Sequence, residues 1–189
     1  MNTKELALIA VFSAVWVATQ MSLGPTISRI TGIHGVVQNL VGWLLMVIVA
    51  ELTGKFGRVS LMAAVAALAT RMIRTPALYM WAVGLGYALG GLTFDLLFFA
   101  PVANNLEGKG RKAYIVTVAL ISGVISNVPY VLFQLFTLLL PAFIIWFPTY
   151  VPLAVKDFVL NVLGALIGLS ILPLIKPWST RIRQRTDQR

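Results

Sequence analysis

Apolar residues gather in six long runs along this chain, and short polar or turn-forming stretches separate the runs. The runs cover residues 5–23, 35–52, 59–73, 77–102, 113–140 and 152–175. About 20 apolar residues in a helix cross the roughly 30 Å hydrocarbon layer of a bilayer. The pattern therefore predicts an all-α integral membrane protein, in which residues 1–189 form a single domain built as a bundle of six transmembrane helices.

The first run carries alanine at every fourth position, at Ala10, Ala14 and Ala18. Residues four apart share one face of a helix, so these alanines form a smooth strip that the backbone of another helix can approach closely. Contact with lipid alone does not require a strip of small residues. We expect it to be a partner-docking face on a helix that is retained and not cleaved as a secretory signal. The alternative is that the alanines are ordinary helix formers packed inside one bundle.

The fifth run is too long for a straight transmembrane helix. Residues 113–140 would extend about 42 Å at about 1.5 Å per residue, so the helix is expected to tilt or kink. Pro129 is the natural kink, because its ring displaces a backbone carbonyl one turn earlier. A loop bracketed by prolines, with aromatic residues suited to the headgroup level, is expected next: Pro141, Trp146, Phe147, Pro148, Tyr150 and Pro152.

The composition supports the membrane setting and excludes several classes of function. The chain is 59% hydrophobic and 11% charged with a mean hydropathy of +0.89, too little polar surface to cover a water-soluble globule. It has no cysteine, which excludes disulfides and thiolate chemistry. It has no P-loop and no catalytic constellation of an intramembrane protease. We expect no enzyme, no cofactor and no energy source in the chain itself.

The distribution of positive charge predicts the orientation in the membrane. With the N-terminus inside, eleven of the fifteen lysines and arginines fall on inner segments: Lys4, Lys55, Arg58, Lys109, Arg111, Lys112, Lys176, Arg181, Arg183, Arg185 and Arg189. The other four fall outside: Arg29, Arg71, Arg74 and Lys156. Cytoplasmic segments carry the excess of Lys and Arg, so both termini are expected to be cytoplasmic in a plasma-membrane protein. The net charge of +9 then reflects topology, and no nucleic acid partner is expected.

Polar and aromatic residues of several runs fall at one depth, in the outer half of the predicted bundle. These residues are Gln38, Asn39, Trp43, Tyr79, Trp81, Asn127, Tyr130, Gln134, Asp157 and Asn161. Polar groups at such depth are costly unless they pair or face a cavity. The functional interpretation is an outward-facing pocket that binds a small molecule. The alternative is interhelical hydrogen bonding beside an interfacial aromatic belt, with Asp157 simply neutralising Lys156.

Two further groups of charged or ionisable residues leave their roles open. Arg29, Arg71 and Arg74 could attract an anionic group on a ligand, or could equally extend to lipid headgroups. The only histidine, His34, is expected at a loop or pocket rim, because no cysteine or second histidine can complete a metal site.

Two acids lie near predicted inner helix ends. Glu51 and Asp95 are expected to pair with Lys55, with Arg58 or with a partner protein, and not to relay protons.

The layout resembles the substrate-binding S components of energy-coupling factor (ECF) transporters. The resemblance rests on six spans in a chain of this length, a short cytoplasmic N-terminus, outer polar residues and the Ala10, Ala14 and Ala18 strip. It implies a vitamin or vitamin precursor held from the outer side, a membrane coupling protein docked on the alanines, and two cytoplasmic ATPases. The branch of that family that binds metal ions uses a histidine close behind the initiator, and residues 2–4 contain none.

Two other classes of function stay open at this point. A stand-alone secondary transporter would use an ion gradient, and a non-catalytic membrane assembly subunit would bind no ligand.

Overall fold

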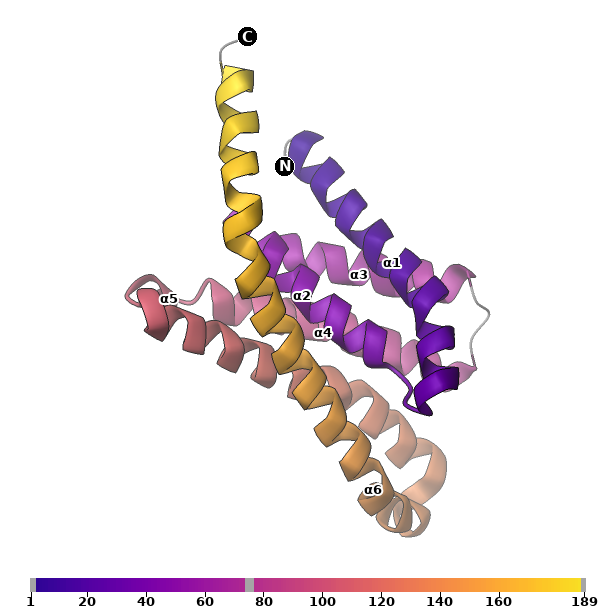
Figure 1. Ribbon diagram of the computed structural model, residues 1–189. Coiled ribbons are helices and arrows are strands. Elements are labelled where there is room, and N and C mark those ends of the chain that lie inside the picture. The colour runs from indigo at the N-terminus through magenta and orange to yellow at the C-terminus, as the bar shows by residue number, and fades with distance from the viewer. Residues whose placement is uncertain (1–2, 74–76, 188–189) are drawn as a thin grey trace.

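The described part of the chain consists of helices joined by short turns and contains no strand (Figure 1). The computed structural model describes residues 3–73 and 77–187, so Arg74 and Arg189 of the predicted charge clusters lie outside the described residues. The helices are α1 (Thr3–Thr31), α2 (Val36–Thr53), α3 (Arg58–Ile73), α4 (Leu78–Phe98), α5 (Pro101–Asn104) and α6 (Gly108–Asp187). The predicted all-α class is confirmed for this part of the chain.

α6 folds back on itself at Leu139, whose φ of 60° and ψ of 163° interrupt the helical backbone. Figure 1 shows one arm running down to the fold and the other returning past the bundle. The arms, 108–138 and 140–187, contain the predicted fifth and sixth runs. The predicted loop over residues 141–151 is wrong, because these residues are helical. Pro141 lies in the first turn of the second arm, where the N–H that proline lacks would be unpaired anyway. Pro129, the expected kink, lies in backbone that stays helical.

Helix ends and apolar runs do not coincide. α1 continues through Gly24 and Pro25 to Thr31, whereas the first apolar run stops at residue 23. α4 ends at Phe98, and the four-residue α5 replaces the predicted end of the fourth run. The last turns of α1 therefore extend beyond the predicted first span.

Within the described part of the chain, four helices are long and apolar enough to cross a membrane, by length and composition. They are α1, α2, α4 and α6 up to Ile175. α3, with 16 residues, is shorter than a usual span. Large apolar side chains remain exposed on the outside of these helices, for example Val11, Leu85 and Phe136. An apolar exterior of this kind is compatible with a membrane protein, because lipid solvates it and water does not.

α2 is the central helix of the bundle, and α1, α3, α4 and α6 all pack against it. Every residue from Leu45 to Ala50 is buried, which explains an apolar run with no polar face. Glycines allow the closest helix crossings. A Cβ added to Gly164 of α6 would lie 2.4 Å from the carbonyl oxygen of Leu40 in α2, and one added to Gly86 of α4 would lie 2.0 Å from that of Ser126 in α6.

Ion pairs join α1, α2, α3 and α6 at one end of the bundle. Glu5, in the first turn of α1, accepts hydrogen bonds from Lys55 and, at 2.7 Å, from Arg58. Glu51 of α2 pairs with Arg111 of α6 at 2.8 Å, a partner that the sequence analysis does not propose. The start of α1 and the end of α6 point toward this same end (Figure 1).

Asp95 of α4 has a different partner from those expected. Its Oδ2 accepts hydrogen bonds from the backbone N–H and the hydroxyl of Ser60, at 2.7 and 2.5 Å, in the first turn of α3. The pairing expected with Lys55 or Arg58 is not found among the described residues. A carboxylate in this position satisfies N–H groups that the helix leaves unpaired and complements the positive end of the helix dipole.

Candidate ligand-binding cavity

A cavity of about 850 Å³ lies at the end of the bundle opposite the Glu5 ion pairs. Its walls come from the second half of α1, the start of α2, the end of α3, the start of α4 and both arms of α6 near the fold. Six of the ten residues predicted from their depth line it: Gln38, Asn39, Tyr79, Asn127, Tyr130 and Asp157. Helix ends that lie far apart in the sequence therefore place these side chains around one space.

A chain of polar contacts crosses the cavity wall from α4 through α2 to α6. The Tyr87 hydroxyl donates to Oδ1 of Asn39 at 2.6 Å, and Nδ2 of Asn39 donates to Oδ1 of Asp157 at 2.6 Å. Nζ of Lys156 lies 3.0 Å from the same carboxylate oxygen. The predicted neutralisation of Asp157 by Lys156 is confirmed, and it occurs at the edge of the cavity.

A second polar group joins α1, α2 and α3. Nε2 of Gln20 donates to Oε1 of Gln38 at 2.8 Å, and the Thr70 hydroxyl oxygen lies 3.3 Å from Oε1 of Gln20. All three side chains line the cavity. The two amides therefore bond to each other at the wall of the cavity.

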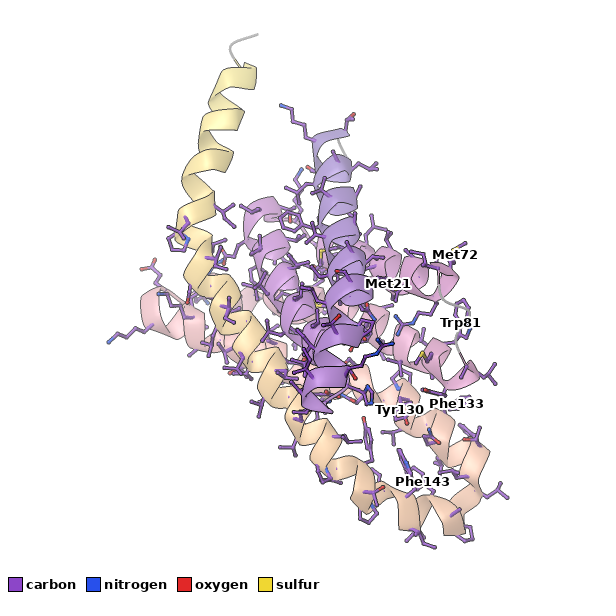
Figure 2. All side chains as sticks on the ribbon, turned by 45° about the vertical axis from the view of Figure 1, so that its right-hand side comes forward. Met21, Met72, Trp81, Tyr130, Phe133 and Phe143 are labelled. Carbon is purple, nitrogen blue, oxygen red and sulfur yellow. The ribbon has the colours of Figure 1, made fainter. Side chains whose placement is uncertain are left out.

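Aromatic rings form the wall contributed by α4 and α6. The ring centroid of Tyr130 lies 6.3 Å from that of Tyr79, 5.9 Å from that of Trp146 and 5.5 Å from that of Tyr150. Tyr150 stacks on Trp146, and its hydroxyl donates to Oδ1 of Asn127 at 2.5 Å. Figure 2 shows Tyr130 and Phe143 on the two arms of α6 near its fold. Tyr150, expected in an interfacial belt, is buried and lines the cavity.

Two of the predicted site residues lie deeper in the bundle than the cavity. Trp43 and Asn161 are each 1% exposed and are not among the described residues that line the space. Trp43 packs against Phe94, and the amide of Asn161 fills the place that a side chain on Gly123 would take. Position along a helix gives depth, whereas the direction around the helix axis decides what a side chain contacts.

The other two predicted site residues that do not line the cavity are Trp81 and Gln134. Trp81 is 46% exposed on the outer face of α4. Gln134 donates from Nε2 to the Tyr130 hydroxyl at 3.0 Å, so it contacts a residue of the cavity wall without lining the cavity itself.

The cavity residues that were not predicted include Tyr87, Gln20 and Thr70, and the first two left a signal in the sequence. Tyr87 follows Tyr79 by eight positions, so both lie on one face of α4. Gln20 is the only amide side chain in the first apolar run, and it lies near the outer end of that run. Thr70 bonds to Ala66 within its own helix as a threonine commonly does, and nothing in the sequence distinguishes it.

The segment between α1 and α2 forms the rim. The Ser28 hydroxyl and the ring of His34 are hydrogen-bonded, and Nζ of Lys156 donates to the carbonyl oxygen of His34 at 2.5 Å. His34 lines the cavity, at the position of a rim residue. Within the described residues no group of three His, Cys, Asp or Glu side chains could hold a metal ion.

The predicted docking strip lies on the outside of α1. Ala10, Ala14 and Ala18 are exposed, while Ile9, Ser13 and Trp16 face the bundle and are buried. The alternative, alanines packed inside the bundle, does not describe their position here. Nothing in the described part of the chain covers this face.

These features define an all-helical chain whose long apolar helices are compatible with a membrane and surround a polar and aromatic cavity. No protein-family model matches the chain, and no curated protein or solved structure matches it.

Proposed function

We propose that this chain is a membrane-embedded binding subunit for the uptake of a small organic nutrient. The observation that carries the proposal is the cavity of about 850 Å³, which has hydrogen-bonding amides and an aromatic wall. Small-molecule sites typically measure about 300–1,000 Å³ and combine apolar or aromatic walls with a few placed polar groups. The helices that form the cavity come together at one end of the bundle, so the site is open to one membrane side.

In this proposal the chain crosses the membrane six times, through α1, α2, α3, α4 and the two arms of α6. Both termini are cytoplasmic, because most Lys and Arg residues then lie inside. The cavity, at the opposite end, faces outward and collects its ligand from outside the cell. The short α3 has an apolar outer face with Leu61, Val65 and Leu68 exposed, which suits a span that contacts lipid on one side, and its 16 residues cross with little tilt.

The energy for uptake comes from partners of the kind found in ECF transporters, a membrane coupling protein and two cytoplasmic ATPases. The resemblance in layout and the exposed Ala10, Ala14 and Ala18 face support this part of the proposal. A face of small residues lets another helix approach within van der Waals contact of the backbone, which is how helices associate in lipid.

The test is native mass spectrometry of the detergent-purified chain, followed by uptake in proteoliposomes. We expect a small organic molecule to co-purify, and we expect the chain alone to bind that molecule without pumping it. Uptake by the chain alone would indicate a stand-alone carrier. A preparation without any bound molecule, and without binding from a nutrient extract, would indicate an assembly subunit and contradict the proposal.

A further inference from the structure

The charge of Arg71 is not balanced inside the cavity. Arg71 lies in the last turn of α3, lines the cavity and is only 6% exposed. The ion pairs of the described residues are Lys55 with Glu5, Arg58 with Glu5, Arg111 with Glu51 and Lys156 with Asp157. Arg71 is in none of them. A guanidinium cannot release its proton, so a buried one needs an anion or a full set of acceptors.

Neutral groups hold the Arg71 side chain in place. Its Nε donates to the carbonyl oxygen of Met80 at 3.2 Å, and its guanidinium carbon lies 6.0 Å from the centre of the Tyr87 ring. The Nε bond is the one hydrogen bond of this side chain within the described residues. A carbonyl and a ring position the guanidinium without neutralising it, and its terminal N–H groups keep their capacity to donate.

Gly84 makes room for this arrangement. A Cβ added to Gly84 would lie 2.8 Å from Nε and 3.2 Å from Cδ of Arg71. The absence of a side chain at this turn of α4 lets Arg71 lie across the helix, between Met80 and Tyr87. The position of the guanidinium is thus built by α3 and α4 together.

The described lining as a whole is positive. It contains the cations Arg29, Arg71 and Lys156 and one acid, Asp157, which gives a formal charge of +2 with His34 neutral. Asp157 is bound by Lys156 and Asn39, so its charge is already compensated at the other end of the hydrogen-bond chain that begins at Tyr87. The uncompensated charge in the buried part of the wall is that of Arg71.

We propose that Arg71 binds the anionic group of the ligand, a carboxylate or a phosphate monoester, and that the ligand's other end is a planar ring. This inference rests on the proposed function and names the chemical class of its substrate. A guanidinium fork matches the two oxygens of such an anion in a bidentate, charge-assisted pair. The ring packs against Tyr79, Tyr130 and Tyr150, whose faces and edges favour offset or edge-to-face contacts.

The test compares four probes that share one ring and differ in charge: benzoate, phenyl phosphate, benzamide and benzylammonium. Each is added at millimolar concentration to the detergent-purified chain, and the melting temperature is measured. We expect benzoate and phenyl phosphate to raise it and the neutral and cationic probes not to. Arg71→Gln should weaken the apparent affinity for benzoate by roughly tenfold to a hundredfold, since charge-assisted hydrogen bonds contribute about 1.5–3 kcal/mol.

Two further variants serve as controls. Arg71→Lys keeps the charge but loses the fork, so it should retain part of the affinity for benzoate. Lys109→Gln removes one positive charge from an exposed position far from the cavity, and it should leave the response to all four probes unchanged.

Each other outcome has a defined meaning. Equal or stronger stabilisation by benzamide or benzylammonium overturns the anion assignment and leaves the binding function intact. No stabilisation by any probe overturns the inference about Arg71 and the ring, whereas the proposed function is decided by the mass-spectrometry test above. Stabilisation by dihexanoyl phosphatidylglycerol that requires Arg71, with none by benzoate or phenyl phosphate, identifies a lipid headgroup as the occupant and also overturns the inference. If Arg71→Gln does not fold, the order of the four probes on the unaltered chain decides.

Discussion

Single glycines in this chain differ in what surrounds them, and that difference predicts their tolerance to a methyl group. A Cβ on Gly86 would meet the backbone oxygen of Ser126 at 2.0 Å, so α4 and the first arm of α6 must separate. Gly86→Ala should therefore destabilise the bundle by about 1–3 kcal/mol, the usual cost of overpacking. The melting temperature in detergent should fall markedly.

Gly110 is the matched control for this substitution. It also lies in a helix, α6, but an added Cβ would meet only Cδ2 of Leu106 at 3.8 Å, an ordinary van der Waals contact. Gly110→Ala should leave the melting temperature unchanged or raise it slightly, because alanine has the higher helix propensity. Equal losses for the two variants would contradict the close approach of α4 and α6.

The hydrogen bonds from Tyr87 to Asn39 and from Asn39 to Asp157 predict a non-additive pair of substitutions. Tyr87→Phe removes one donor and keeps the ring under Arg71, whereas Asn39→Ala removes a partner from both neighbours. Interhelical hydrogen bonds in membranes average about 0.6 kcal/mol, so each change should lower the melting temperature modestly. In the double variant Tyr87→Phe should add little to Asn39→Ala. Full additivity would show that the two side chains do not interact.

At the scale of elements, the fold of α6 depends on one residue in an unusual conformation. Leu139 has a φ of 60° and a ψ of 163°, a region that glycine occupies easily and that costs other residues about 1–3 kcal/mol. Its side chain is 71% exposed, so little packing would be lost on its removal. Leu139→Gly should therefore raise the melting temperature.

Leu140 provides the comparison for Leu139. It is 62% exposed, and its backbone is helical. Leu140→Gly should lower the melting temperature by the ordinary cost of glycine in a helix, about 1 kcal/mol. A stabilising effect at residue 140 together with a loss at residue 139 would place the fold of α6 at a different residue.

The exposed strip on α1 predicts the effect of bulky residues on assembly. Ala14→Trp should abolish co-purification of the proposed coupling protein and leave ligand affinity nearly intact, because a contact built on small residues cannot absorb an indole. Leu85→Trp on the exposed face of α4 is the control, and it should not affect assembly. Retention of the partner by Ala14→Trp would argue against the strip as a docking face.

The sequence predicts the elements of this fold better than their ends. Apolar runs identify the helices, and the fifth run ends at residue 140, beside the fold at Leu139, but the extension of α1 to Thr31 leaves no mark in hydropathy. A turn made by an apolar residue is chosen by packing of the two arms. The candidate site follows the same rule, because depth alone places Asn39 and Asn161 together, whereas rotation about the helix axis directs only Asn39 to the cavity.

For the whole molecule, the proposal of six crossings predicts which positions an impermeant reagent can reach. The chain has no cysteine, so single cysteines introduced at exposed positions report on one site each. Arg29→Cys and Thr149→Cys lie at the cavity end, and Lys55→Cys and Lys109→Cys lie at the end of the Glu5 ion pairs. In intact cells a membrane-impermeant maleimide should label the first two alone.

Permeabilised cells should make all four cysteines reactive, which shows that each position is accessible. The comparison between Thr149→Cys and Lys109→Cys tests the crossing of the first arm of α6, because these positions flank residues 113–140. Labelling of both from outside would mean that this arm lies along the membrane and does not span it. The cavity would then not face outward as an entry site, since its wall includes Asn127 and Tyr130 of that arm. Labelling of Lys55→Cys and Lys109→Cys alone would keep the crossings but reverse the orientation, which would turn the cavity toward the cytoplasm and rule out nutrient capture from outside.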